Sequence, residues 1–236
     1  MDLASKIAYE LKSLANAKKA ATHQRFFKTA PGEYGAGDRF HGVPVPQQRS
    51  IAKKHLSAAT EQTIQKLLQS DFHEERLTAL LLLVYKFKED HKNGHGEKWV
   101  NLYLKNTHRV NNWDLVDSSA HHILGAWLDN IDRKLLYQMA DSSSLWENRI
   151  AVIATAHFIR KNDLTDILSL SEKLIDHPHD LMHKAVGWML REAWVKDAKK
   201  IEDFLRINAS KMPRTMLRYA IEKFPERKRQ AFLKLT

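Results

Sequence analysis

Residues 77–84 read Leu-Thr-Ala-Leu-Leu-Leu-Leu-Val, and this stretch decides the fold class. Leu77, Leu80, Leu81 and Val84 recur at the three- and four-residue spacings that place side chains on one face of an α-helix. Strand-like alternation is essentially absent from the chain. The sequence therefore predicts an all-α protein, with further stripes at Leu3, Ile7, Leu11 and Leu14, at Ile64, Leu67 and Leu68, and at Ile150, Ile153, Ala154, His157 and Phe158.

Signals for helix starts recur at similar intervals. They fall near Asp71, Asn111, Ser144, Asp180 and Met212–Pro213, at separations of 40, 33, 36 and 33 residues, and a second, shorter helix fits into each interval. Periods of about 33 to 47 residues are typical of tetratricopeptide, HEAT and armadillo arrays, and the tetratricopeptide pattern is missing. We expect HEAT-like helical repeats stacked into a curved solenoid, as one domain over residues 1–236, with an irregular helical bundle as the alternative.

Turn-forming residues are concentrated in one segment. Seven of the fourteen Gly and Pro residues lie between residues 31 and 46. Such a cluster favours irregular structure or a short hairpin, which we place near residues 31–42.

Composition narrows the classes of partner. The 38 Lys and Arg residues against 28 Asp and Glu give a formal charge of +10, which favours nucleic acid, and an anionic membrane second. The absence of Cys excludes disulfides, thiol nucleophiles and cysteine-ligated zinc. The longest strongly apolar run, Leu80–Tyr85, is far shorter than the roughly 20 residues of a membrane span, and Met1–Lys19 lacks a signal-peptide pattern. We expect a soluble, cytoplasmic protein, nucleoid-associated if bacterial.

The first candidate for chemistry is the stretch Asn-Asn-Trp-Asp-Leu-Val-Asp at residues 111–117. Either Asn can cap a helix, which places Trp113 and Asp117 one turn apart on one face and turns Leu115 and Val116 toward the core. The indole can stack on a base while the carboxylate presents a negative charge to it. The alternative is a tryptophan half-buried in a seam beside a solvated aspartate.

Two later segments offer further candidates. Arg149 follows the expected helix start at Ser144 at a level similar to that of Asp117, and it can pair with Asp117, bind phosphate or do both. Gly187 precedes Trp188 inside another expected helix. Glycine costs about 1 kcal/mol there, which indicates close approach of backbone or ligand. Ordinary core packing is the alternative for Trp188.

In order and spacing, residues 113–117, Arg149 and the run Gly187–Glu192 resemble the alkylpurine DNA glycosylases made of HEAT-like repeats, the AlkD-like family. The resemblance covers nearly the whole chain, from the helix before residues 42–49 to residues 220–224. It implies excision of purines alkylated on ring nitrogens, such as 3-methyladenine and 7-methylguanine, from double-stranded DNA. It implies no base-flipping pocket, which departs from the usual behaviour of glycosylases.

The resemblance also implies roles for individual residues. Asp117 would be the essential carboxylate, Trp113 and Trp188 the DNA-contacting tryptophans, and Arg149 the key arginine that grips a phosphate. No metal and no organic cofactor are implied, and we expect a monomer because a DNA-filled groove needs no second copy. Further DNA contacts are expected from Arg25, Lys28, Arg49, Arg191, Arg214 and Arg218.

Some residues depart from the family pattern. Pro44 stands where the family can place a polar residue, and Phe26 or Phe27 replaces a tyrosine of the early helix. Residues 31–38 look like an insertion that resembles subfamilies with a hairpin beside the DNA groove, and some of those relatives show little base excision. A catalytically weak paralogue that binds branched DNA is therefore the second hypothesis, and a HEAT-type scaffold for an acidic protein is the third.

Basic pairs and clustered histidines are two further features of the sequence. Pairs such as Lys53–Lys54 and Lys199–Lys200 are usually solvated faces, but collectively they favour binding to DNA that weakens steeply with salt. His177, His179 and His183 are close in sequence, yet they lack the Glu of a zinc-hydrolase helix, so we interpret them as structural. The adjacent His121 and His122 are interpreted in the same way.

Overall fold

The computed structural model describes residues 1–235 and confirms that the protein is all-α. Within that range the only β-type contact is an isolated bridge between Arg39 and Phe72. Contacts divide the chain into two compact units, residues 1–119 and 120–236, called unit 1 and unit 2 below. Each unit buries its own set of apolar side chains. A single continuous domain stays a prediction.

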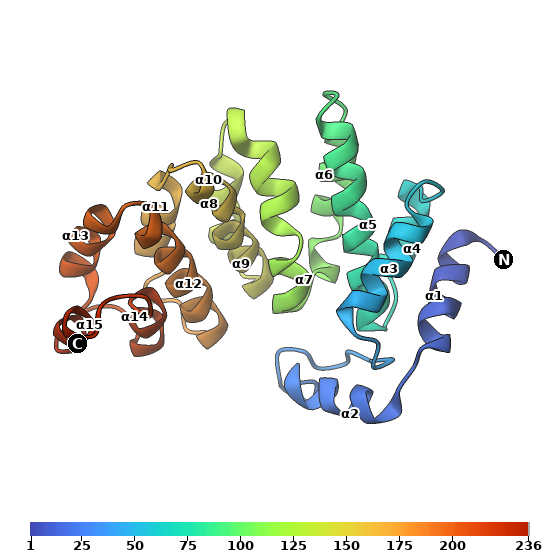
Figure 1. The fold of residues 1–236 in the computed structure, drawn as a ribbon, viewed down its shortest axis with the longest axis horizontal. Coiled ribbons are helices and arrows are strands. Elements are labelled where there is room, and N and C mark those ends of the chain that lie inside the picture. The colour runs from blue at the N-terminus through green and yellow to red at the C-terminus, as the bar shows by residue number, and fades with distance from the viewer. Residues whose placement is uncertain (236) are drawn as a thin grey trace. The chain divides into compact units, whose positions relative to one another are not determined.

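Unit 1 is a stack of helices around one long central helix. The helix α5 (His73–His91) contacts its neighbours α3, α4 and α6 (Figure 1). Every residue from His73 to Val84 is buried. The leucine-rich stretch thus forms the core, because a helix that is apolar on most sides must be covered on most sides. The other elements are α1 (Leu3–Ser13), α2 (Ala17–Phe26), α3 (Val45–His55), α4 (Glu61–Leu68), α6 (Glu97–Lys105), η1 (Thr107–Arg109) and α7 (Trp113–Asp117).

Unit 2 has the same kind of organisation. Its longest helix, α12 (Asp180–Lys196), contacts the helices on both sides of it in the sequence. The other elements are η2 (His121–Gly125), η3 (Leu128–Asn130), α8 (Lys134–Ala140), α9 (Leu145–Ala154), α10 (Ala156–Arg160), α11 (Thr165–Lys173), α13 (Ala198–Asn208), α14 (Arg214–Ala220) and α15 (Glu226–Leu233).

The predicted helix starts agree with the structure within two residues. The helices α5, α7, α9, α12 and α14 begin at His73, Trp113, Leu145, Asp180 and Arg214. Two predicted stripes are shorter than expected. The helix α1 ends at Ser13 and leaves Leu14 41% exposed, and the stripe from Ile150 to Phe158 is divided at Thr155 between α9 and α10.

For the glycine-rich segment the sequence predicted either irregular structure or a short hairpin, and the structure shows irregular structure. Residues 30–37 form turns and bends, and no hairpin is present among the described residues. Instead of pairing with itself, the segment pairs with the turn before α5, where the Arg39 amide donates to Asp71 O at 3.1 Å and the His73 amide donates to Arg39 O at 2.8 Å. The loop is thereby fixed at the N-terminal end of α5.

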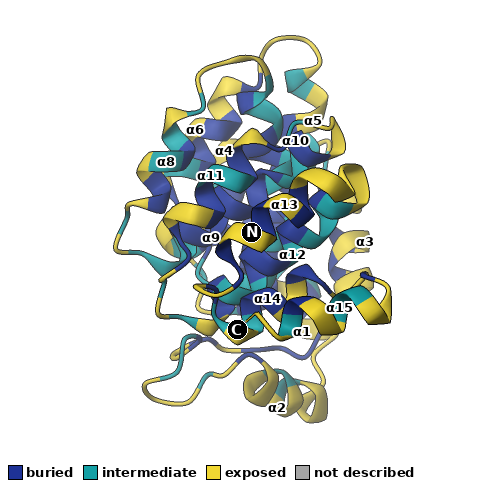
Figure 2. Ribbon diagram, turned by 90° about the vertical axis from the view of Figure 1, so that its left-hand side faces the viewer, coloured by how far each residue is buried: buried dark blue, intermediate teal, exposed yellow. Residues whose placement is uncertain are grey.

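The helix α2 is unusual because none of its residues is buried (Figure 2). Its sequence contains Lys18, Lys19 and Arg25 and no acidic residue. The Asn16 side chain caps its first turn, and Phe27 after its last turn is buried. In its middle, the half-buried His23 lies 3.8 Å from Glu74 and against the Phe40 ring. A basic helix is therefore exposed over most of its surface, and only Ala20 and His23 are partly covered.

Among residues 1–235, no helix combines the length and the apolar character that crossing a bilayer requires.

Candidate functional site

The short helix α7 presents the predicted Trp113 and Asp117 as the sequence suggested. The Asn112 side chain caps it and accepts a hydrogen bond from the Trp113 amide at 2.8 Å. Leu115 and Val116 are fully buried, whereas Trp113 and Asp117, four residues apart, are both partly exposed. The helix therefore uses one face for the core and presents an indole and a carboxylate on the other.

The indole of Trp113 belongs to an aromatic cluster. It stacks on Phe27 with ring centroids 5.2 Å apart and meets the edge of Phe26 at 5.7 Å. Phe27 continues the stack onto Phe40 at 5.2 Å. Phe26 is 61% exposed, so an apolar ring at the end of the basic helix α2 lies open to solvent beside Trp113.

Beneath α7, a buried ionic network joins three segments of the chain. The His73 ring contacts Asp114 Oδ2 through Nε2 at 2.8 Å and Asp38 Oδ2 through Nδ1 at 3.1 Å. Arg76 donates to the other oxygen of Asp38 at 2.6 Å. Asp38 comes from the glycine-rich loop and Asp114 from α7. The network therefore fixes the loop and the Trp113–Asp117 helix to the same point of α5.

This network keeps His73 in its charged form. Burial of the ring opposes protonation, but the charge of Asp114 and the hydrogen bonds to Asp114 and Asp38 outweigh it and raise the pKa of His73 to about 9. Burial also raises the pKa of Asp38, and the bonds and charges of His73 and Arg76 more than reverse that effect, so the pKa of Asp38 lies below its ordinary value. Basic and acidic side chains thus alternate along the network, in the order Arg76, Asp38, His73 and Asp114.

A second buried carboxylate holds the chain that leads into α3. Glu74 accepts hydrogen bonds from the backbone amides of His41, Gly42 and Val43 at 3.0, 2.8 and 3.2 Å. Gly42 has φ +81°, and a Cβ there would lie 2.3 Å from Asn16 O, so only glycine fits this turn. Pro44 follows as the N-cap residue of α3. The sequence between α2 and α3 is thus fixed to α5 at two places.

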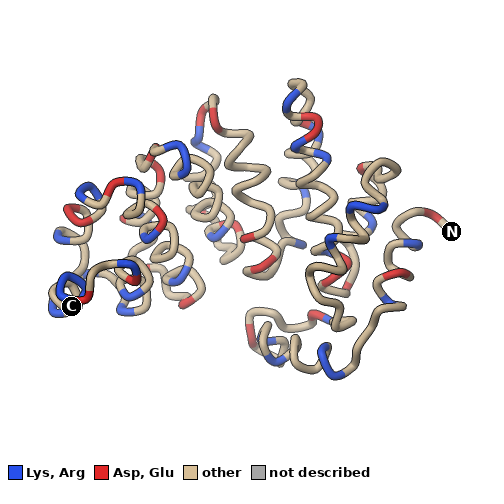
Figure 3. Tube along the Cα trace, in the orientation of Figure 1, with Lys and Arg blue, Asp and Glu red and all other residues tan. Residues whose placement is uncertain are grey.

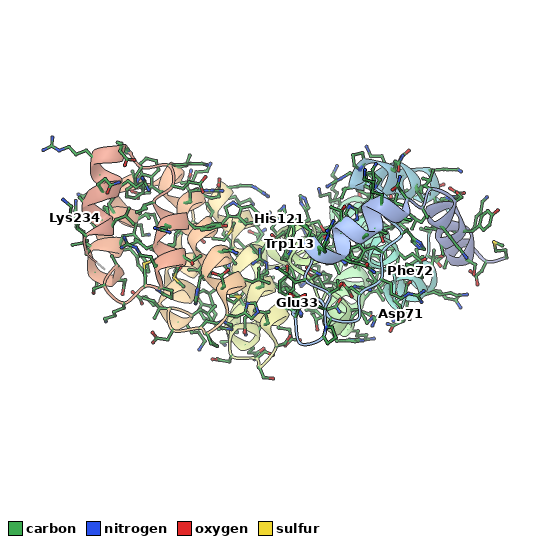
Figure 4. All side chains as sticks on the ribbon, turned by 90° about the horizontal axis from the view of Figure 1, so that it is seen from below. Glu33, Asp71, Phe72, Trp113, His121 and Lys234 are labelled. Atoms are coloured by element: carbon green, nitrogen blue, oxygen red, sulfur yellow. The ribbon has the colours of Figure 1, made fainter. Side chains whose placement is uncertain are left out.

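Asp117 lies at the last residue of α7 and close to a buried tyrosine. Tyr103 is fully buried, its hydroxyl lies 3.1 Å from Ser119 Oγ, and burial together with the charge of Asp117 raises its pKa. Asp117 thus lies at the border between the core of unit 1 and solvent. Figure 4 shows Trp113 on the same side of unit 1 as Glu33 of the glycine-rich loop.

Arg149 is a buried residue of unit 2. It is 4% exposed, and its Nη1 donates to Leu181 O in the first turn of α12 at 2.6 Å. Its neighbour Asn148 donates to the carbonyls of Met139, Ala140 and Ser142 at 2.9 to 3.2 Å. The first turn of α9 is thus fixed to both α8 and α12. The phosphate-binding role expected of Arg149 stays a prediction.

The three clustered histidines help to build this corner of unit 2. The ring of His177 contacts Asn148 Oδ1 at 3.1 Å, and His183 Nε2 donates to His177 O at 2.6 Å. His179 caps α12 by accepting from the Leu181 amide at 3.1 Å. Burial lowers the pKa of both His177 and His179. These bonds agree with the structural roles expected for them.

Trp188 is half-buried on α12. It lines a hollow of about 250 Å³ together with residues of α10 and α12 that include Arg160, Glu192 and Lys196. The preceding Gly187 has a clear packing reason, because a Cβ there would lie 2.5 Å from Met216 O and 2.5 Å from the Cβ of Tyr219. The sequence predicted that either a backbone or a ligand comes close to Gly187. The structure shows the backbone of α14 there.

The basic residues predicted to contact DNA differ in whether they have partners within the protein. In unit 1, Arg25, Lys28 and Arg49 are exposed, the first two at the end of α2 and the third on α3. In unit 2, Arg191 forms ion pairs with Glu222 and Glu192, and Arg214 donates to Leu233 O at 2.7 Å. Arg218 is exposed on α14. DNA would therefore compete with internal partners at Arg191 and Arg214, and their contacts with DNA stay predictions.

Sequence reasoning missed the residues that support α7. His73, Asp38 and Arg76 are distant from Asp114 in sequence, and nothing in their local pattern indicates a shared network. The available signal was the opening of α5, where His-Glu-Glu-Arg at residues 73–76 precedes a leucine run that must be buried. Four polar residues continuous with a buried helix need partners, because unpaired buried charges are costly.

Comparison with known proteins identifies the family of the chain and supports its fold. The sequence matches the family model described as DNA alkylation repair enzyme over residues 7–224. A structure from Enterococcus faecalis, described as a predicted DNA alkylation repair enzyme, superposes on this chain with a TM-score of 0.71. The two sequences are 15% identical, and the match covers 90% of this chain and 97% of that one. At this identity the likeness shows the fold. No curated protein matches the sequence. The match over most of its length shows that this chain belongs to the DNA alkylation repair enzyme family, which supports a role in DNA repair.

Proposed function

We propose that this protein is a monofunctional DNA glycosylase that removes cationic N-alkylated purines from double-stranded DNA, with Asp117 as the catalytic carboxylate. The observation that carries the proposal is the placing of the partly exposed Trp113 and Asp117 on one face of α7, which the part-buried bond between Asp114 and His73 holds in position. An enzyme site needs such support, because a catalytic group must keep its position through the reaction.

Excision of a cationic purine requires the protein to stabilise only the charge that develops on the sugar. Alkylation of a ring nitrogen gives the purine a positive charge, so the base departs as a neutral molecule and positive charge develops on the deoxyribose. A carboxylate close to the sugar stabilises that charge and can orient the attacking water. Asp117 supplies the carboxylate. Because the leaving base needs no further activation, the proposal includes no metal and no organic cofactor.

The tryptophans and the basic residues position the DNA. Trp113 offers a ring face that attracts the cationic nucleotide, and Trp188 is proposed to do the same from unit 2. Arg149, Arg25, Lys28 and the other basic residues are proposed to contact phosphates, which fixes the strand without reading its sequence. A monomer is sufficient for this arrangement.

The test is release of bases from duplex DNA treated with a methylating agent. The wild type is expected to release 3-methyladenine and 7-methylguanine faster than they depart spontaneously, and Asp117→Asn is expected to reduce that excess rate by about 100-fold or more, the usual effect of losing one electrostatic contact to the transition state. The matched control is Asp71→Asn, because Asp71 is an exposed aspartate of the same unit. A wild-type rate equal to the spontaneous one would refute the proposal.

A second function is favoured by the exposed loop and helix beside Trp113. Residues 30–32 and the basic helix α2 are exposed, and Arg149 is buried. This combination would suit a catalytically weak protein that binds branched DNA. Gel shifts with linear and four-way duplexes test it, together with a variant in which residues 30–33 are replaced by a shorter turn while Gly35 and Asp38 are kept. Equal affinity of both proteins for both DNAs would eliminate this function.

A further inference from the structure

We infer that unit 1 carries a second nucleic-acid site, a groove between the C-terminal ends of α3 and α5 that binds an unpaired stretch of strand. The groove has a volume of about 670 Å³ and is lined by Lys53, Leu56, Tyr85, Lys88, Glu89, Lys92 and Asn93. It is called the Tyr85 groove below. None of its residues belongs to the site around Trp113, and the inference goes beyond the proposed excision.

The groove follows from the pattern of α5. Tyr85, Lys88, Glu89 and Lys92 follow one another at helical spacings of three, one and three, so they form one stripe along the last two turns of the helix. The same side of α5 changes there from the buried Leu81 to a half-buried tyrosine and then to charged residues. Lys53 and Leu56 on α3 form the facing wall. A helix end that is amphipathic in this way presents an apolar floor with a basic rim.

The charges of the rim favour an anion. Lys53, Lys88 and Lys92 surround one carboxylate, Glu89, which leaves a net charge of +2 at the groove. Within residues 1–235, Lys53 and Lys92 have no ion pair with an acidic side chain, although their neighbours Lys54 and Lys98 pair with Glu10 and Asp90. Figure 3 shows basic and acidic positions alternating at this end of α5. The ammonium groups of Lys53 and Lys92 at the edge of the hollow are therefore available for phosphates.

The apolar floor of the groove, formed by Tyr85 and Leu56, favours single-stranded nucleic acid over an acidic peptide or a duplex. A half-buried tyrosine ring beside Leu56 provides an apolar surface on which a base can stack, and rings flanked by cations are the usual site for single strands. An acidic peptide would use the lysines but leave the floor uncovered. Paired bases present only their edges to the protein. The geometry therefore favours a nucleotide whose base is unpaired, with its phosphates on the lysines.

The groove is separate from the site around Trp113. Tyr85 and Lys92 follow His73 by 12 and 19 positions, which corresponds to about 18 and 28 Å along a helix that rises about 1.5 Å per residue. His73 lies beneath the Trp113 helix, so the two sites lie toward opposite ends of α5. Occupation of one leaves the other accessible, and loss of one need not affect the other.

Fluorescence anisotropy with a labelled single-stranded thymidine 12-mer tests the inference. Tyr85→Ala is expected to weaken binding by about 5-fold or more, the effect of losing one base–aromatic stack. The triple variant Lys53→Gln, Lys88→Gln, Lys92→Gln is expected to lower the slope of log affinity against log salt by about 2, since each phosphate contact on a single strand contributes about 0.7. The matched control is Lys6→Gln, Lys12→Gln, Lys105→Gln, which removes the same charge from exposed lysines of unit 1.

The results separate the alternatives. Equal affinities of the groove triple variant and the control triple variant would overturn the inference, because the oligonucleotide would then respond to net charge alone. Displacement of the 12-mer by poly-glutamate at equal charge concentration, with no effect of Tyr85→Ala, would assign the groove to an acidic protein and would also overturn it. Photocross-linking of a 5-iodouracil 12-mer to the peptide that contains Tyr85 would support it independently of base excision.

Discussion

The charged state of His73 makes the stability of unit 1 depend on pH in a way that can be calculated. The pKa of His73 rises from an ordinary value of 6.5 to about 9 in the folded chain. A shift of that size corresponds to about 3 kcal/mol of folding free energy, at about 1.4 kcal/mol per pH unit. Because the folded-state pKa is the higher one, this stabilisation is complete below about pH 6.5, declines as the pH rises toward 9, and is absent above it.

The perturbation is His73→Gln, which keeps an amide donor and removes the titrating ring. We expect the free energy of unfolding of the wild type to fall by about 3 kcal/mol more than that of the variant between pH 6 and pH 9.5. Titration of His157, His177 and His179, whose pKa values are lowered, contributes with the opposite sign but is common to both proteins and cancels in the difference. Urea unfolding at several pH values gives the global free energies.

Hydrogen exchange of peptides that cover residues 107–119 locates the effect in unit 1. The control is His108→Gln, because His108 is an exposed histidine of the same unit. Its pH profile should follow that of the wild type. Parallel profiles for the wild type and His73→Gln would refute the reasoning, since they would mean that His73 is not a buried cation between Asp38 and Asp114.

Three further predictions test packing and binding. Gly187→Ala is expected to destabilise unit 2 by about 1 to 3 kcal/mol in thermal or chemical unfolding, because the new Cβ would lie 2.5 Å from Met216 O. Alanine is otherwise the better helix former, so a more stable variant would contradict the close approach of α14. Leu115→Ala is expected to cost about 2 to 5 kcal/mol, since Leu115 lies on the fully buried face of α7; a cost below 1 kcal/mol would show that α7 is not packed on the core. If all six predicted basic residues contact duplex phosphates, log affinity should fall against log salt with a slope of about −5, and a flat response would exclude duplex DNA as the partner.

Much of the fold was predictable because its signals are local. The leucine spacing of residues 77–84 and the caps at Asn112 and Ser144 depend on neighbours within one helical turn, and the structure confirms them. The turn-rich loop was recognisable from its glycines and prolines. Its attachment was not, because the pairing of Arg39 with Phe72 and the bond from Asp38 to His73 join residues more than thirty positions apart.

The candidate site was predictable only at its surface. The spacing of Trp113 and Asp117 was sufficient to place them on one face of a capped helix, with Leu115 and Val116 on the other. The support below them was not visible, because a buried histidine with two carboxylate partners looks in sequence like any charged helix start. Arg149 shows the same limit, since its burial against Leu181 depends on how α12 packs on α9.

The most direct measurement for the proposed chemistry is the single-turnover rate of base release from a duplex that contains one 7-methylguanine, with enzyme in excess so that binding affinity does not limit the rate. The account predicts that the wild type and Asp71→Asn release the base at the same rate, well above that of the free duplex, and that Asp117→Asn binds the duplex as tightly but releases the base about 100-fold more slowly. Equal rates for Asp117→Asn and the wild type would contradict the assignment of Asp117 as the carboxylate that stabilises the departing sugar cation.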